Sequence, residues 1–459
     1  MKRVLLTLVS ILVLATPALA VDFSFHGDLK TEFRINSNQT GFTSDNFGSE
    51  VGTVDTNDDI NSIADDDVNE SFAAFKYRLW TEAASDNGAI KGVYAVEIGG
   101  SRFGDGSGEK GAGFSGDGVN IETRWAYTDF ALGGGRMKVG LQPVKINKFF
   151  WNETAAGIHY KIGDFEAAWL RGYEIGSQED DANDGDFESL DAFYARYNLK
   201  PTSDVKIGFF GVWQTSNTDK LAPGTDSDMT GNDYVVKSMP KKDIDLYTIG
   251  VDGGMKAGNL FANWDLMIQS GEFGEELDFG GYFAHFDLGT KLGNNGKLTY
   301  TFWYASGDDD TTDSNLDAFI ATDIDVKADF SSVVLYQGLN SDEYFTTEPY
   351  IQDKGMMMNR LGYDTKVSDK LKVGAAAMYM MTAEDMKYSD SVTGAEYKEN
   401  SIGFEIDAYA KYKLYDSLEL AMAAGYLMSG DALGIYDAVR DGSADEDIYV
   451  VTSRIRYKF

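Results

Sequence analysis

The feature that most constrains the fold of this chain is a two-residue alternation of apolar and polar side chains. It is plain in DFSFHGDLKTEFRI (22–35), SFAAFKYRLWTEA (71–83), SIGFEIDAYAKYKLY (401–415) and DIYVVTSRIRYKF (447–459). Successive side chains of a strand point to opposite faces, so each stretch predicts a strand with one apolar and one polar face. The composition agrees, because the chain has 28 Phe and 26 Tyr but only 6 Pro, and proline cannot donate to a β-ladder.

The connections between these strands sort into two lengths. The short ones are tight turns at residues 85–88, 132–135, 161–164, 200–204, 256–259, 293–296, 368–370 and 415–417. The long ones are polar segments near 36–70, 100–118, 143–154, 175–186, 217–242, 271–278, 307–355, 384–399 and 429–447. Short turns that alternate with long loops predict about 18 strands, and this sorting of the connections between two rims is typical of a transmembrane β-barrel.

We therefore expect an all-β, antiparallel, up-and-down transmembrane barrel with short periplasmic turns and long extracellular loops. The alternative is 16 strands, because the stretches near 143–162 are weakly patterned. Within the longest loop, DIDVKADFSSVVLYQGL (323–339) is compatible with an extra hairpin. A secreted sandwich or solenoid would also alternate, but nothing would sort its connections by length.

The first 20 residues, MKRVLLTLVSILVLATPALA, have a basic start, an apolar run and an Ala-Leu-Ala end. This pattern predicts an export signal peptide that is cleaved near Ala20, which leaves 21–459 as a single barrel domain. A membrane anchor is the alternative, but the run is short for a helical span, and no later stretch approaches the roughly 20 apolar residues such a span needs. A closed barrel is the other way to cross a bilayer, so the expected location is the cell outer membrane.

The long loops carry much of the formal net charge of −34. Residues 45–70 and 177–188 contain Asp and Glu but no Lys or Arg. Acidic outer loops would repel anions and concentrate cations at the mouth of the barrel, and the alternative is that they are merely solvated. Divalent cation binding is a further alternative, but no stretch has the EF-hand spacing. With no Cys and three His in the chain, we expect no metal site and no cofactor.

Basic residues gather instead on the polar faces of strands that should meet where the last strand closes against the first. The candidates for this lumen wall are Lys30, Arg34, Lys76, Arg78, Arg124, Arg454 and Arg456. Asp265 and Asp287 are expected at a similar height across the barrel, beside Asn263 and His285. Such a basic wall facing carboxylates would create a transverse field in a polar, water-filled lumen. The alternative is that these are solvated charges with no selective role.

The sequence resembles Gram-negative outer-membrane porins and is most similar to the homotrimeric porins of sulfate- and metal-reducing deltaproteobacteria. The resemblance lies in VDFSFHGDLKTEFRI (21–35), FKYRLWTEAASDNGAIKGVYAVEIGG (75–100), GEKGAGFSGDGVNIETRWAYTDF (108–130) and RMKVGLQPV (136–144). It implies a homotrimer of water-filled barrels in contact with outer-membrane lipid and lipopolysaccharide. It also implies that the barrel-assembly machinery reads Phe459, behind Tyr457, as an assembly signal.

Porins of this kind often fold one outer loop into the lumen as a constriction. The matching segment is KINKFFWNETAAG (145–157), with Lys145, Lys148 and Glu153 as candidate constriction residues. The other candidate is 307–355, which contains the apolar run LDAFIA (316–321).

The expected function is passive diffusion of small hydrophilic solutes and ions. The alternative is a substrate-specific channel for small phosphate- or carboxylate-like anions, since Arg and Lys replace anion hydration by charge-assisted hydrogen bonds. No His lies in a catalytic motif, so we expect no enzymatic activity. We also expect no binding of nucleic acid. A sheath for an electron-transfer cytochrome would need a partner, because the chain has no Cys for haem attachment.

Overall fold

The computed structural model describes the chain from Val21 to Phe459 with several gaps. The described residues are 21–39, 68–104, 111–112, 119, 121–175, 188–216, 243–274, 277–310, 313–326, 331–336, 348–389, 394–433 and 446–459. The expected signal peptide (1–20) and most of the acidic loop residues lie outside this part of the chain.

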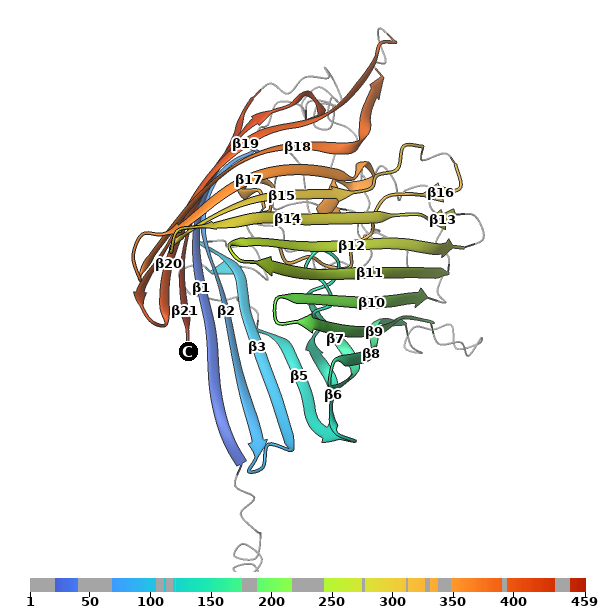
Figure 1. Cartoon of the computed structure of the whole chain (residues 1–459), viewed down its shortest axis with the longest axis vertical. Helices are drawn as coiled ribbons and strands as arrows, with labels where there is room; N and C mark the ends of the chain where they lie inside the picture. Colours follow the sequence, from blue (N-terminus) through green and yellow to red (C-terminus); the bar gives the residue numbers. More distant parts are fainter. Residues whose placement is uncertain are drawn as a thin grey trace, which may run out of the picture.

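Eighteen long antiparallel strands of the described residues form one closed sheet (Figure 1). They are β1 (Val21–Gln39), β2 (Val68–Ser85), β3 (Ile90–Phe103), β5 (Ile121–Leu132), β6 (Gly135–Pro143), β7 (Thr154–Ile162), β8 (Phe165–Ile175), β9 (Glu188–Thr202), β10 (Val205–Ser216), β11 (Ile244–Ala257), β12 (Leu260–Phe273), β14 (Tyr282–Leu292), β15 (Gly296–Ala305), β17 (Met356–Lys366), β18 (Leu371–Ser389), β19 (Glu396–Tyr415), β20 (Leu418–Ser429) and β21 (Ile448–Lys458). β21 pairs with β1 from Asp28↔Lys458 to Ser37↔Tyr449, which closes the barrel. The predicted 18-strand fold is confirmed.

The alternative of 16 strands is wrong, and the described part of 323–339 is not a hairpin. Val333–Tyr336 form a four-residue helix, α2, and the 3₁₀ turns η2 (Glu348–Tyr350) and η3 (Gln352–Lys354) precede β17. Three short strands lie in long connections: β4 (Gly111–Ala112), β13 (Leu277–Phe279) and β16 (Asn315–Leu316). No helix among the described residues is long and apolar enough to cross a membrane.

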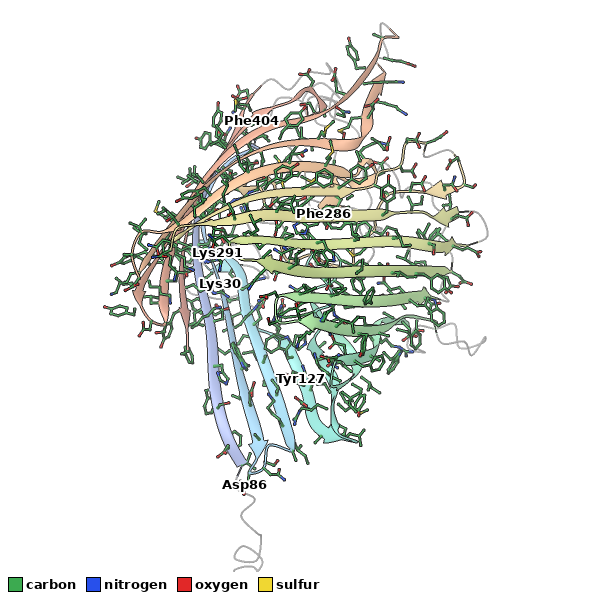
Figure 2. The ribbon with its side chains drawn as sticks, in the orientation of Figure 1. Lys30, Asp86, Tyr127, Phe286, Lys291 and Phe404 are labelled. Carbon is green, nitrogen blue, oxygen red and sulfur yellow. The ribbon has the colours of Figure 1, made fainter. Side chains whose placement is uncertain are left out.

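The outward face of the barrel is apolar and rich in aromatic residues. On β21, Tyr449, Ile455 and Tyr457 are exposed, whereas the alternate residue Thr452 is buried inside. Phe286 and Phe404 lie on the same outer face of β14 and β19 (Figure 2). An exposed band of this kind is the surface that a lipid bilayer would cover.

The inner wall is polar only in part, which corrects the expectation of a polar interior throughout. From β8 to β21 many inward side chains are apolar, and the connection 143–153 and the described parts of 306–355 fold into the barrel and cover them. The resulting buried core includes Phe149, Phe150, Trp151, Phe210, Phe283, Trp303, Phe319, Tyr336, Tyr350 and Met358. An apolar segment can enter a lumen only where the wall is apolar too, since both surfaces must leave water together.

Candidate functional site: the charged wall of the lumen

The predicted basic residues lie on inward faces of β1, β2, β5 and β21, on both sides of the seam. Lys30 is directly opposite Lys76 on β2 and Arg456 on β21. Among the described residues, the buried cores take no side chain from β1, β2, β3 or β5. The apolar layer therefore does not pack on this part of the wall, and we call it the seam wall.

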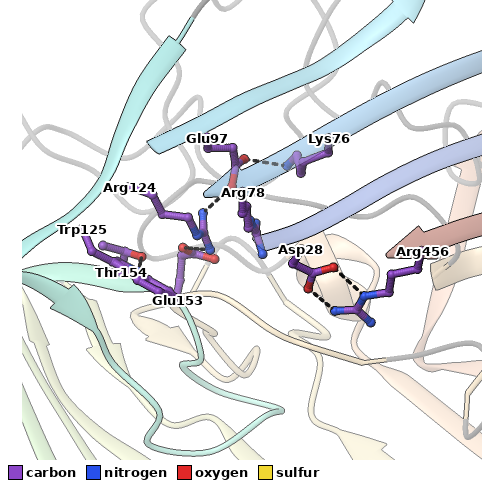
Figure 3. A network of polar contacts seen from close by, with 9 residues as sticks. All are labelled: Asp28, Lys76, Arg78, Glu97, Arg124, Trp125, Glu153, Thr154 and Arg456. Atoms are coloured by element: carbon purple, nitrogen blue, oxygen red, sulfur yellow. Dashed lines mark hydrogen bonds and ion pairs between the residues drawn. The ribbon is translucent and has the colours of Figure 1, made fainter. Parts of the chain in front are cut away.

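Glu97 on β3 organises the centre of the seam wall (Figure 3). Its carboxylate forms an ion pair with Lys76 at 3.1 Å and with Arg124 at 3.2 Å, and it accepts a hydrogen bond from Arg78. Glu97 is only 6% exposed. Three cations thus share one buried carboxylate, which leaves a local excess of positive charge.

A second set of ion pairs crosses the seam itself. Arg456 on β21 donates two hydrogen bonds to Asp28 on β1, one of them 2.7 Å long from Nε. Lys458 approaches the same carboxylate at 3.9 Å. Arg454 pairs with Glu419 on β20 at 3.3 Å. The basic wall expected from the sequence is therefore a mixed wall, in which cations outnumber the carboxylates between them.

The sequence reasoning did not assign the carboxylates Asp28, Glu97 and Glu419 to this wall. The apolar–polar alternation does indicate that these three carboxylates point into the lumen, because each lies on the polar face of its strand. Arg34 points the same way, is buried, and donates a hydrogen bond to Asn36 at 2.7 Å. The missing information was the register between strands, which decides which carboxylate meets which cation.

Across the lumen, Asp265 on β12 and Asp287 on β14 hold His285 between them. His285 Nδ1 lies 2.8 Å from Asp265 and Nε2 lies 3.3 Å from Asp287. Asp287 also accepts hydrogen bonds from Thr301 at 2.7 Å and from Asn263 at 3.2 Å. The structure thus brings together the two predicted carboxylates, but each is already engaged by its neighbours.

The segment 143–153 is anchored to this acidic group. Asn147 donates a hydrogen bond to Asp265 at 2.6 Å, and the Phe149 ring lies 4.6 Å from the His285 ring between centroids. Of the three candidate constriction residues, Lys145 is exposed and Lys148 lies over the Phe149 ring at 4.4 Å. Glu153 reaches the seam wall and pairs with Arg124 at 2.8 Å.

The second inserted connection packs directly on the first. Tyr350 donates a hydrogen bond to the carbonyl of Phe149 at 2.6 Å, and Asn152 donates one to Asp325 at 2.7 Å. The apolar run 316–321 is buried, and the Phe319 ring lies 5.3 Å from that of Phe283 and 5.7 Å from that of Tyr350 between centroids. The two candidate constriction loops are therefore one interlocked layer inside the barrel.

A buried carboxylate fixes the far end of this layer. Glu405 on β19 accepts hydrogen bonds from the backbone N–H groups of Val333 at 2.9 Å and Val334 at 3.0 Å, and from the Ser332 hydroxyl at 2.6 Å. The first N–H groups of a helix have no partner within the helix. Glu405 supplies that partner and so holds α2 against the wall.

Two carboxyl groups outside the strands lie close together where 306–355 enters the barrel. Burial, with a smaller contribution from the charge of the nearby Asp353, raises the pKa of Asp308 to about 6. Burial also raises the pKa of Asp353, against the opposing effect of Lys354, which pairs with it at 2.7 Å. Asp308 is thus a loop carboxyl whose pKa, at about 6, lies well above its ordinary value of 3.8.

At the short-turn end, the two proposed assembly-signal residues lie on the outer surface. The rings of Tyr457 and Phe459 are 5.2 Å apart between centroids. The backbone of Phe459 exchanges hydrogen bonds of 3.0 and 3.2 Å with Gly27 on β1. A side chain at position 27 would collide with the Phe459 ring, so glycine permits this close approach.

No protein-family model and no curated protein matches the chain. Solved structures match its fold. OccK9 (OpdG) of Pseudomonas aeruginosa has a TM-score of 0.53 at 11% identity, over 95% of this chain and 98% of that one. The outer membrane protein OprD of the same organism has a TM-score of 0.50 at 10% identity, over 97% and 95%. OccAB4 of Acinetobacter baumannii has a TM-score of 0.50 at 8% identity, over 97% and 100%. At these identities the likeness is one of fold.

Proposed function

We propose that the chain is an outer-membrane porin, a water-filled channel through which small hydrophilic solutes and ions diffuse passively. The observation that carries this proposal is a closed barrel, apolar outside, whose charged seam wall lies outside the apolar layer that fills the opposite side. Charged groups such as Arg78 and Arg124 are stable inside a barrel only beside water or a counter-charge. The shared fold of the outer membrane protein OprD supports the location.

The test is a planar bilayer measurement on purified, folded protein. We expect stepwise conductance increments with a linear current–voltage relation at moderate voltage. Folded barrel can be recognised by its altered gel migration without heating. Absence of conductance steps from protein that shows this heat-modifiable migration would contradict the proposal. Detergent without protein is the control.

A substrate-specific channel for small anions is the second candidate. Lys76, Arg78 and Arg124 outnumber their carboxylate partners Glu97 and Glu153, which favours it because donors are left for an oxyanion. A specific channel should be blocked by inorganic phosphate or acetate at low millimolar concentration or below, whereas a general porin should stay ohmic. The same recordings therefore separate the two candidates.

Several finer proposals come from the sequence resemblance. These are a homotrimer, contact with lipopolysaccharide, export by a signal peptide cleaved near Ala20, and recognition of Tyr457 and Phe459 by the barrel-assembly machinery. Cross-linking or native mass measurement of the purified protein tests the trimer. N-terminal sequencing of the mature protein tests the cleavage site.

A further inference from the structure

The cavity at the short-turn end of the lumen has a strongly basic lining. It has a volume of ≈ 1380 Å³ and extends from the short turns to Lys148 and His285 at the inserted layer. Its described lining includes ten Lys, one Arg and six Asp, a net charge of +5 with His285 neutral. This concentration of positive charge stands out in a chain whose formal net charge is −34. We call this cavity the lysine vestibule.

The lysines come from the ends of successive strands, next to the short turns. Lys291 precedes the turn between β14 and β15, and Lys297 follows it; Figure 2 shows Lys291 at this end of β14. His285 and Trp303 are buried inside the barrel. Lys291 lies an even number of residues from His285 on β14, and Lys297 lies an even number of residues from Trp303 on β15. Their side chains therefore lie on the inward face. Lys200, Lys206, Lys256 and Lys366 hold equivalent places at neighbouring turns.

The register puts like charges side by side in this ring. Lys291 is directly opposite Lys297, and Lys372 is directly opposite both Lys366 and Lys411. Cβ atoms of such pairs are roughly 4.5–5.5 Å apart, and like charges at this position destabilise a sheet. A solvated rim that served only solubility would gain nothing from these pairings.

At least three of the six carboxylates of the lining are engaged by groups other than lysine. Asp252 forms a bidentate pair with Arg196, and Asp265 and Asp287 are engaged by His285. Among the described residues, neither Lys291 nor Lys297 forms an ion pair with a carboxylate. Lys291 and Lys297 thus add positive charge to the cavity without a carboxylate partner, and Lys297 Nζ lies over the Phe261 ring at 4.7 Å.

Building on the channel function proposed above, we propose that the lysine vestibule is a binding site for small multivalent oxyanions. A monovalent anion can pair with only one ammonium group, so its affinity increases little when several lysines surround it. A ligand with three or more negative charges can contact several lysines at once, and each charge-assisted contact adds to the others. Lysine suits this role because its ammonium is a point charge on a flexible stem that adapts to different oxyanion shapes.

The test is calorimetric titration of inorganic tripolyphosphate into the folded, full-length protein at low ionic strength. We expect saturable binding that weakens steeply with added salt, as expected for screened charges, and no saturable binding of acetate. Replacement of one opposed pair, in Lys291→Gln/Lys297→Gln or in Lys366→Gln/Lys372→Gln, should weaken tripolyphosphate binding roughly tenfold.

A matched control is available at the other end of the barrel. Lys387 and Lys398 form an opposed lysine pair on β18 and β19 at the long-loop end, outside the vestibule. Lys387→Gln/Lys398→Gln should bind tripolyphosphate like the unmodified protein. Equal weakening in this control, or no saturable binding by folded protein, would overturn the proposal. Conductance of the same preparation reports separately on the channel function, because a channel can conduct without this site and the site can bind without conduction.

Discussion

At the scale of single residues, Glu97 determines the charge of the seam wall. Lys76, Arg78 and Arg124 come from two different strands and meet at this one carboxylate. A buried carboxylate is stable only when cations and hydrogen-bond donors surround it. Lys and Arg side chains are flexible, and the ion pairs with Glu97 hold the three charged groups in place. Glu97 therefore acts both as a counter-charge and as a positioning residue.

Glu97→Gln should make the proposed channel more selective for anions. The substitution keeps the size of the side chain, removes one negative charge and leaves three cations at the wall. We expect the reversal potential in a tenfold KCl gradient to move by roughly 10 mV toward the chloride value, out of about 59 mV for perfect selectivity. Glu396→Gln, at the exposed long-loop end of β19, is the control and should leave the reversal potential unchanged.

Arg78→Glu combined with Arg454→Glu should shift selectivity in the opposite direction, toward cations. The two substitutions change the formal charge of the seam wall by four, so the shift should exceed that of Glu97→Gln. Reversal potentials in the same gradient measure it. An unchanged reversal potential, in protein with normal heat-modifiable migration, would contradict a selective role for the seam wall.

At the scale of elements, 143–153 and 306–355 stabilise each other inside the barrel. The first is held to the wall by Asn147, and the second by Glu405 beneath α2. Tyr350 joins the two through the carbonyl of Phe149. Each connection thus has at least one anchor on the wall, and the two share a contact with each other. Loosening one anchor should therefore affect the whole layer.

Asn147→Ala should loosen this layer and enlarge the proposed channel. It removes a hydrogen bond to the carboxylate of Asp265, and bonds to charged groups contribute about 1.5–3 kcal/mol. We expect higher single-channel conductance and more current noise. Lys145→Ala removes an exposed side chain of the same segment and should behave like the unmodified protein. Identical conductance of all three proteins would mean that this segment does not constrict the pore.

The docking of 306–355 should weaken as the pH rises through about 6. The pKa of Asp308 is raised to about 6 in the docked state, above its ordinary value of 3.8, so docking favours the protonated form. The stabilisation is complete below the ordinary value and is lost as Asp308 ionises beside Asp353. Hydrogen exchange of this connection should be faster at pH 7.5 than at pH 5, and Asp308→Asn should remove most of the difference.

The elements were easier to predict than the site. Each strand end follows from a break in the two-residue alternation next to Gly, Asn or Asp, as at 85–88 and 293–296, and these are local signals. The partners of Glu97 depend on register between strands, and the burial of Phe149 depends on which wall it meets. Both are long-range properties, so a single sequence does not encode them in any short pattern.

At the scale of the whole molecule, β1 and β21 must find each other to close the barrel. Their seam combines ladder hydrogen bonds, the Asp28–Arg456 pair and the contact of Phe459 with Gly27. A closed sheet has no unpaired edge, which is a condition for stability in lipid. The end of the chain that closes the barrel also carries the proposed assembly signal, so closure and the proposed recognition by the assembly machinery can be tested separately.

Phe459→Ala separates these two roles. The backbone hydrogen bonds to Gly27 do not require the phenyl ring, so the purified variant should still refold into detergent or lipid and show heat-modifiable migration. In cells, where the proposed assembly signal would be read, the folded amount in the outer membrane should fall several-fold. Phe25→Ala removes an exposed aromatic ring of comparable size from β1 and should assemble normally in both settings. The assembly machinery is present only in cells. If the folded amount of Phe459→Ala fell equally in cells and in purified refolding, Phe459 would contribute to stability alone.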